Sequence, residues 1–146
     1  MNSLIINQNN SEPSDKLARL VNFSRLKILV VDDEVDSLDI LIAILEQENA
    51  EIIPVASATE AIEAFNRNIP DLIVSDIGMP TTDGYTLIEQ IRALPQGRNI
   101  PAIALTAYAN EIDRQRSFEA GFQKHLAKPI MIPELIAAIT ELTSYN

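Results

Sequence analysis

Five polar residues end apolar, strand-like runs, and their types could together handle a phosphate group. KILVVDD ends on Asp32 and Asp33, DLIVSD on Asp76, AIALT on Thr106 and HLAK on Lys128. If these ends share one edge of a sheet, three carboxylates converge and require either a raised pKa or a cation. Oxygen ligands without His or Cys favour a hard ion such as Mg²⁺. A hydroxyl and an ammonium group opposite the carboxylates would complete a cradle for a phosphoryl group.

Each of these residues also has an ordinary explanation when it is taken alone. A carboxylate after a strand is commonly a turn former or a helix cap, and a lysine is commonly a solvated charge. Thr106 is of a type that suits any strand. Their joint position, at the end of one strand after another, is what favours a chemical site.

Strand-like and helical segments alternate from Lys27 to the C-terminal end. The expected strands are 27–33, 51–56, 71–76, 102–106 and 125–128, and the expected helices are 35–49, 57–66, 85–94, 110–120 and 133–142. Strict alternation predicts a doubly wound, three-layer (βα)5 α/β fold of the flavodoxin-like type, with a parallel five-stranded sheet in the order 2-1-3-4-5. Such folds bind ligands where the strand order reverses, between the first and third strands.

Local signals support this reading of the elements. Pro54 predicts an edge strand because it cannot donate a ladder hydrogen bond. SATE, from Ser57 to Glu60, is a capping box. Gly121 is placed to close the fourth helix, and Pro133 suits the first turn of the last helix.

Composition excludes several classes of protein. The 146 residues fit one domain, and a net charge of -10 argues against a nucleic-acid or anionic-membrane partner. There is no cysteine, signal peptide or membrane-length apolar run, so we expect a soluble cytoplasmic protein. Residues 1–25 predict a polar N-terminal extension with at most a short helix, and residues 26–146 the domain itself.

The motifs VVDDE, SDIGMPTTDG, LTA and LAKP, in this order, resemble those of the response-regulator receiver (CheY-like) domain of two-component and phosphorelay signalling. The resemblance covers about residues 27–142. It implies that Asp76 is the phosphoacceptor, and that Asp33 and Asp76 bind Mg²⁺, or Mn²⁺ in its place. Asp32 would assist, usually through water, and the backbone carbonyl of Gly78 would be a third ligand.

The resemblance also assigns roles at the last two strands. Thr106 would be the switch hydroxyl, while Lys128 would contact the phosphoryl oxygens, pair with Asp76 before transfer and precede a cis bond to Pro129. His125 stands where the family usually has an aromatic residue whose rotamer follows phosphorylation. A switching role and a plain strand histidine both remain open, and imidazole would add pH sensitivity.

A receiver catalyses its own phosphorylation and slow dephosphorylation, with the donor supplied in trans. His125 is the only histidine and no nucleotide fingerprint is present, so the expected partner is a sensor histidine kinase or a histidine phosphotransfer protein. Tyr108 is expected to screen attacking water and lengthen the phosphorylated lifetime. By analogy a downstream protein would dock on the fourth helix, fifth strand and fifth helix, around Arg114, Arg116, His125 and Glu134, and a homodimer is left open.

Three other readings compete with a single-domain response regulator. The chain could be the receiver of a hybrid sensor kinase, since MPTTDGYTLIEQIR and AIALTAYA resemble receivers attached to such kinases. A haloacid-dehalogenase-type phosphatase uses a similar residue set, but its first strand should end in Asp-x-Asp, and DDEVD does not fit. A phosphate-independent binding module would not need the complete Asp, Thr and Lys set.

Overall fold

A single parallel sheet of five strands organises the part of the chain that the structure describes. The structure is a computed structural model, and it describes residues 23–107 and 110–143. The strands are β2 (Lys27–Val31), β3 (Glu51–Val55), β4 (Leu72–Asp76), β5 (Ala102–Thr106) and β6 (Lys124–Ala127). They lie in the order β3-β2-β4-β5-β6, and all neighbouring pairs are parallel. The predicted order 2-1-3-4-5 and the doubly wound α/β class are therefore confirmed.

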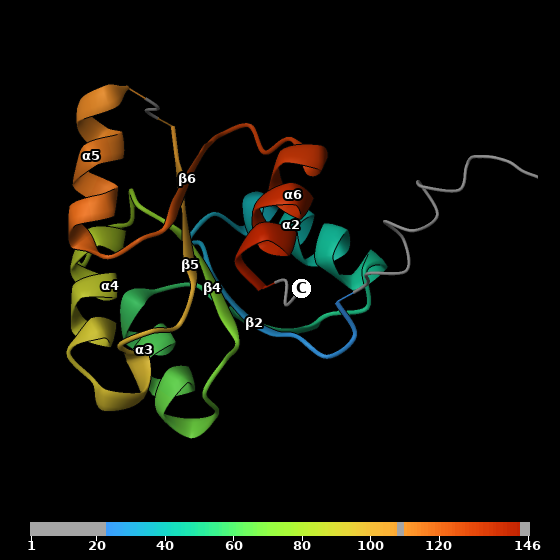
Figure 1. Cartoon of the computed structure of the whole chain (residues 1–146), viewed down its shortest axis with the longest axis horizontal. Helices are drawn as coiled ribbons and strands as arrows, with labels where there is room; N and C mark the ends of the chain where they lie inside the picture. The colour runs from blue at the N-terminus through green and yellow to red at the C-terminus, as the bar shows by residue number, and fades with distance from the viewer. Residues whose placement is uncertain (1–22, 108–109, 144–146) are drawn as a thin grey trace, which may run out of the picture.

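Five helices of the described residues cover the two faces of this sheet. They are α2 (Val35–Gln47), α3 (Ala58–Arg67), α4 (Gly84–Arg92), α5 (Glu111–Ala120) and α6 (Ile132–Thr143), with a short 3₁₀ helix η1 (Pro95–Gly97). Helices α3, α4 and α5 lie on one face, and α2 and α6 on the other (Figure 1). The three layers predicted from the sequence are present.

Two hydrophobic cores follow from the alternation of side chains along the central strands. Leu29 and Ile73 point toward the α3–α4–α5 layer, while Ile28 and Val74 point toward α2 and α6. All four side chains are fully buried. A strand buried on both faces is continuously apolar, which is why these runs could be identified without polar alternation.

Two helices end earlier than their sequence pattern predicted. The helix expected over 35–49 ends at Gln47, because Asn49 adopts a positive φ of 68° that cannot continue a right-handed helix. The helix expected over 85–94 ends at Arg92, since Leu94, which precedes Pro95, is extended.

The predicted caps and edge are present, with one difference of detail. Ser57 Oγ accepts a hydrogen bond from the Glu60 amide at 3.1 Å, but Glu60 Oε1 accepts from the amide of Ala56 rather than from that of Ser57. Gly121 closes α5 with a φ of 132°, and β3, which contains Pro54, lies at the sheet edge.

Most of the predicted N-terminal extension, residues 1–22, lies outside the described residues, and the boundary at residue 25 stays a prediction. Phe23 is buried in the core beside α2, and its amide donates to the carbonyl of Glu48. Within the described ranges, no helix has the length and apolar character needed to cross a bilayer.

Candidate functional site

The five polar residues that end the strand-like runs lie at the carboxyl edge of the sheet. Asp76 is the last residue of β4, whose neighbours are β2 and β5. Asp32 and Asp33 follow β2, Thr106 ends β5, and Lys128 follows β6. The ladder continues past the strand ends, because the Lys128 amide donates to the carbonyl of Thr106 at 2.8 Å. The edge predicted from the strand order is therefore where these residues meet.

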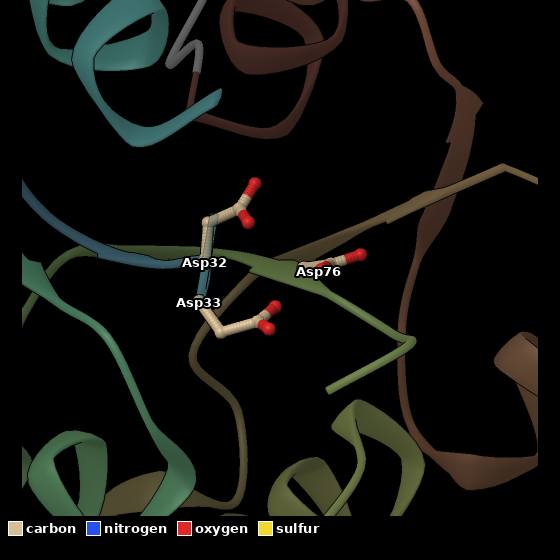
Figure 2. A group of neighbouring side chains, drawn as sticks. All are labelled: Asp32, Asp33 and Asp76. Carbon is tan, nitrogen blue, oxygen red and sulfur yellow. The ribbon is translucent and has the colours of Figure 1, made fainter. Parts of the chain in front are cut away.

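Three of these residues form an acidic cluster with the geometry of a cation site. Asp32 and Asp33 leave the end of β2 on opposite sides, and the carboxylate of Asp76 lies beside them (Figure 2). One oxygen from each residue lies within 4.8 Å of the others. Asp32 and Asp76 are buried, and Asp33 is half-buried. Oxygen donors gathered this closely fit a hard divalent ion such as Mg²⁺, which favours carboxylates and water over nitrogen or sulfur.

Lys128 faces three carboxylates. Its Nζ lies 3.2 Å from Asp32 Oδ2, 3.5 Å from Asp76 Oδ1 and 3.6 Å from Glu34 Oε1. Asp32 is held on its other oxygen, which accepts a hydrogen bond from the Glu34 amide at 3.0 Å. The shortest contact of the lysine is thus with Asp32. The sequence reading did not include Glu34, although it directly follows the paired aspartates.

Burial and charge act in opposite directions on the pKa values of this cluster. Burial raises the pKa of Asp76 above 3.8, and the charge of Asp32 adds to this; Lys128 and the Gly78 amide oppose it. Burial alone would lower the pKa of Lys128, but the charges of Asp76, Asp32 and Glu34 outweigh it and raise that pKa. The surrounding carboxylates therefore favour the ammonium form of Lys128, and that ammonium group in turn favours the carboxylate form of Asp76.

The loop after β4 presses its backbone against Asp76. A side chain at Gly84 would collide with the backbone carbonyl oxygen of Asp76, so only glycine permits this approach. The Gly78 amide lies 3.4 Å from Asp76 Oδ1, and Gly78 is exposed. The bond between Lys128 and Pro129 is cis, as expected from the resemblance. The role of the Gly78 carbonyl as a ligand stays a prediction.

A cleft of about 480 Å³ opens over this edge of the sheet. Among its lining residues are five that the sequence singled out: Asp33, Asp76, Gly78, Thr106 and Lys128. It extends to three further residues whose part in the cleft the sequence reading missed: Tyr85, Asp113 and Arg116. No strand-end pattern marks these three, since they come from helices α4 and α5.

His125, on β6, is not among the residues that line the cleft. The imidazole is half-buried, and its Nε2 is buried without a hydrogen-bond partner among the described residues. Burial lowers the pKa of His125, and Arg114 lowers it further against the opposing charge of Asp113. Tyr108, which the sequence linked to the phosphorylated lifetime, lies outside the described residues.

Comparison with known proteins places this geometry in a family. The family model for the response regulator receiver domain matches residues 28–140. The 14.6 kDa protein in the sodA1 3' region of Leptolyngbya boryana is 45% identical over 81% of this chain and 90% of its own length. Transcriptional regulatory protein PrrA of Mycobacterium tuberculosis is 34% identical over 80% of this chain and 49% of PrrA, so the chain spans about half of that relative.

A solved structure agrees with these matches. The receiver domain of sensor histidine kinase PA1611 from Pseudomonas aeruginosa is 33% identical, with a TM-score of 0.75, over 80% of this chain and 96% of that one. It is described with a magnesium ion coordinated in its active site cleft. The family-model match over residues 28–140 includes the carboxyl ends of all five strands.

Proposed function

This chain belongs to the response regulator receiver domain family, and from that premise we propose that Asp76 accepts a phosphoryl group from the phosphohistidine of a partner protein. The observation that carries the proposal is the convergence of buried Asp76 with Asp32, Asp33 and Lys128 at the carboxyl edge of the sheet, where Asp33, Asp76 and Lys128 line an open cleft. Receiver domains work with histidine kinases or histidine phosphotransfer proteins, and we assign such a partner here.

Mg²⁺ would be held by Asp33 and Asp76, with the Gly78 carbonyl as a further ligand and Asp32 acting through water. The donor set fits, because two or three carboxylate oxygens leave room for waters and one phosphoryl oxygen. When bound, the ion supplies positive charge that binds the phosphoryl oxygens and lowers their repulsion from the carboxylates.

The transfer step needs little from the protein beyond alignment and charge. Asp76 Oδ forms a bond to phosphorus while the bond from phosphorus to the histidine nitrogen breaks, and that nitrogen keeps the electron pair. Lys128 would offer its ammonium group to the phosphoryl oxygens, since it already lies between Asp32 and Asp76. A loose in-line transition state is stabilised mainly by such positioned charges.

The signalling step would follow from the new charge at Asp76. A phosphoryl group brings about -1.5 to -2 charges and would draw the Thr106 hydroxyl inward. The expected change reaches α5, β6 and α6, on which Arg114, His125 and Glu134 lie. A switch from about 1:99 to 99:1 requires about 5.5 kcal/mol of differential binding, so a partial population shift is expected.

We further propose that the chain acts as a single-domain response regulator in the cytoplasm. The Leptolyngbya relative supports this, since the chain covers most of its length. A receiver within a larger regulator or a hybrid sensor kinase would use the same chemistry at Asp76, so the central test is the same for both.

The test is intact mass after incubation with Mg²⁺ and acetyl phosphate, for the wild type and Asp76→Asn. The expected result is one phosphate adduct in the wild type and none in the variant. Wild type that gains no adduct from acetyl phosphate, or from phosphoramidate, would instead support a phosphate-independent binding module. An adduct that persists in Asp76→Asn would place the acceptor on another residue.

A further inference from the structure

The cleft has far more room than a phosphoryl group requires. A water molecule occupies about 30 Å³ in the liquid. If each of the four heavy atoms of a phosphoryl group occupies a similar volume, most of the cleft's volume of about 480 Å³ stays free. The additional space runs from Asp76 toward α4 and α5, where Tyr85, Asp113 and Arg116 line it. This end of the cleft is open to the part of a donor that does not become attached to the protein.

Arg116 presents a cation at that end. Its guanidinium carbon lies 4.2 Å from the centroid of the Tyr85 ring, within the range of a cation–π interaction. No hydrogen bond or ion pair connects Arg116 to another described residue. The exposed guanidinium therefore stacks on Tyr85 while its N–H donors remain available to a ligand.

Tyr85, on which Arg116 stacks, is positioned by its neighbour Gly84 against the backbone of Asp76. Tyr85 is 7% exposed and directly follows Gly84, the residue that packs against the backbone carbonyl oxygen of Asp76. The Gly84 amide also donates to the carbonyl of Ile77 at 2.9 Å. Because these contacts fix Tyr85 relative to the end of β4, they also fix where its stacked arginine stands relative to Asp76.

Two other arginines show what is particular to Arg116. Arg92 uses its donors within the fold, on the carbonyls of Gly97 and Gly121, each at 2.7 Å. Arg114 lies 5.2 Å above the ring of Phe118 and does not line the cleft. Of the three, Arg116 alone combines free donors with a place in the cleft.

Most of the charged groups that line the cleft are negative, so Arg116 would be the partner of an anionic group there. Its lining carries four carboxylates, from Asp33, Glu34, Asp76 and Asp113, which oppose the approach of an anionic donor. Lys128 is engaged by Asp32, Asp76 and Glu34 at the phosphoryl end. An anionic group farther out in the cleft would meet Arg116 as its positive partner.

The leaving group of a donor would lie in the outer part of the cleft. In-line displacement places it on the side of phosphorus opposite Asp76, toward open space. With acetyl phosphate, the Asp76 Oδ–P bond forms, the P–O bond to the acetyl group breaks, and acetate leaves with the electron pair and a negative charge. With phosphoramidate the P–N bond breaks and neutral ammonia leaves, so no negative charge develops on the leaving group.

We propose that Arg116, stacked on Tyr85, is a specificity-determining residue that favours phosphodonors with an anionic leaving group, such as acyl phosphates. The inference rests on the proposed phosphorylation of Asp76 and adds to it a preference among donors. A contact of this kind strengthens as charge develops on the leaving group, so it would act on the rate of transfer and not only on donor binding.

The test compares two donors and two matched variants. Rates of adduct formation with Mg²⁺ are measured by intact mass over a range of acetyl phosphate and phosphoramidate concentrations, for wild type, Arg116→Ala and Arg114→Ala. Arg116→Ala is expected to slow acetyl phosphate roughly three- to ten-fold and to leave phosphoramidate within about two-fold of wild type. Arg114→Ala, on the same helix but outside the cleft, should change neither rate, and Arg116→Lys should recover part of the acetyl phosphate rate.

The outcomes separate this inference from the proposed function. Equal slowing with both donors, or no slowing with either, would overturn the role of Arg116 while the Asp76 adduct formed with phosphoramidate still stood. Absence of any adduct in the wild type would remove the proposed function itself. Circular dichroism of each variant distinguishes a lost fold, which would slow both donors alike, from a lost contact.

Discussion

Helices α4 and α5 both flank the cleft, yet they are anchored very differently. α4 buries five of its nine residues: Gly84, Tyr85, Leu87, Ile88 and Ile91. α5 buries two of its ten, Ser117 and Ala120, and leaves Ile112 79% exposed and Phe118 39% exposed. We call β2, β4 and α4 the acceptor side, and α5 with β6 the reader side. The contrast indicates that the acceptor side is built to stay in place and the reader side to move at low cost.

Polar groups show the same contrast. On the acceptor side, both carboxylate oxygens of buried Asp32 have partners, the Glu34 amide and Lys128. On the reader side, Ser117 Oγ and His125 Nε2 are buried without partners, and they are the only such side-chain atoms among the described residues. A buried polar atom without a partner costs free energy, so a rearrangement that satisfies these two would be favoured.

The largest expected effect is at Lys128, which follows β6 but contacts the carboxylates of the acceptor side. Lys128→Ala should slow phosphorylation by acetyl phosphate about 10²- to 10³-fold, because a preorganised charge on the transferring group is lost. The rate of adduct formation by intact mass measures this. Lys124→Ala is the control, since Lys124 lies on β6, four residues before Lys128, and pairs with Glu141 instead. A Lys128→Ala rate within five-fold of wild type would contradict the proposed contact of Lys128 with the transferring phosphoryl group.

The next effect compares the anchoring of the two helices directly. Leu87→Ala on α4 should lower the free energy of unfolding by about 2–5 kcal/mol, since the side chain is fully buried. Ile112→Ala on α5 should change it by less than about 0.5 kcal/mol. Urea denaturation of both variants measures the difference. Similar losses in the two would show that α5 is held as firmly as α4.

The sequence was enough to predict which residues end the strands and how the strands are ordered. Asp32, Asp33, Asp76, Thr106 and Lys128 could be grouped because parallel strands deliver their carboxyl ends to one edge, whatever the details of packing. The alternating pattern was likewise enough to predict the sheet order. Periodicity and strand order are local or topological properties, and the sequence carries them directly.

Contacts between distant elements could not be predicted in this way. Arg116 was expected only on an output surface, because its place in the cleft depends on how α5 is rotated against Tyr85 of another helix. The short contact of Lys128 to Asp32 depends on the path of the chain after β6. The weak burial of α5 was hidden by the closing signal at Gly121, which sets where a helix ends and not how deeply it packs.

A smaller effect tests the buried hydroxyl on the reader side. Ser117→Ala removes an oxygen that has no partner and keeps the small side-chain volume, so the free energy of unfolding should rise by about 1 kcal/mol. Urea midpoints at constant m-value measure it. A loss of stability would show that the hydroxyl is satisfied in solution, and the contrast between the two sides would weaken.

The smallest effect concerns pH and His125. Burial, followed by the charge of Arg114, holds the pKa of folded His125 below 6.5, so the unfolded chain takes up the proton first as the pH falls. The effect of His125 on the free energy of unfolding is absent above about pH 6.5, and below that pH it destabilises the fold progressively. His125→Phe should therefore lose less thermal stability than wild type between pH 7 and pH 5.5. Parallel melting curves for the two proteins would exclude a buried, neutral imidazole.

The most direct test of the division between the two sides is amide hydrogen exchange with and without phosphorylation. Wild type and Asp76→Asn are compared in Mg²⁺, before and after treatment with acetyl phosphate, and exchange is followed by peptide. We expect altered exchange over residues 102–127, concentrated in α5 and β6, with β2 and α4 unchanged and no response in Asp76→Asn. Changes centred on α4, or an equal response in Asp76→Asn, would contradict this division of the molecule.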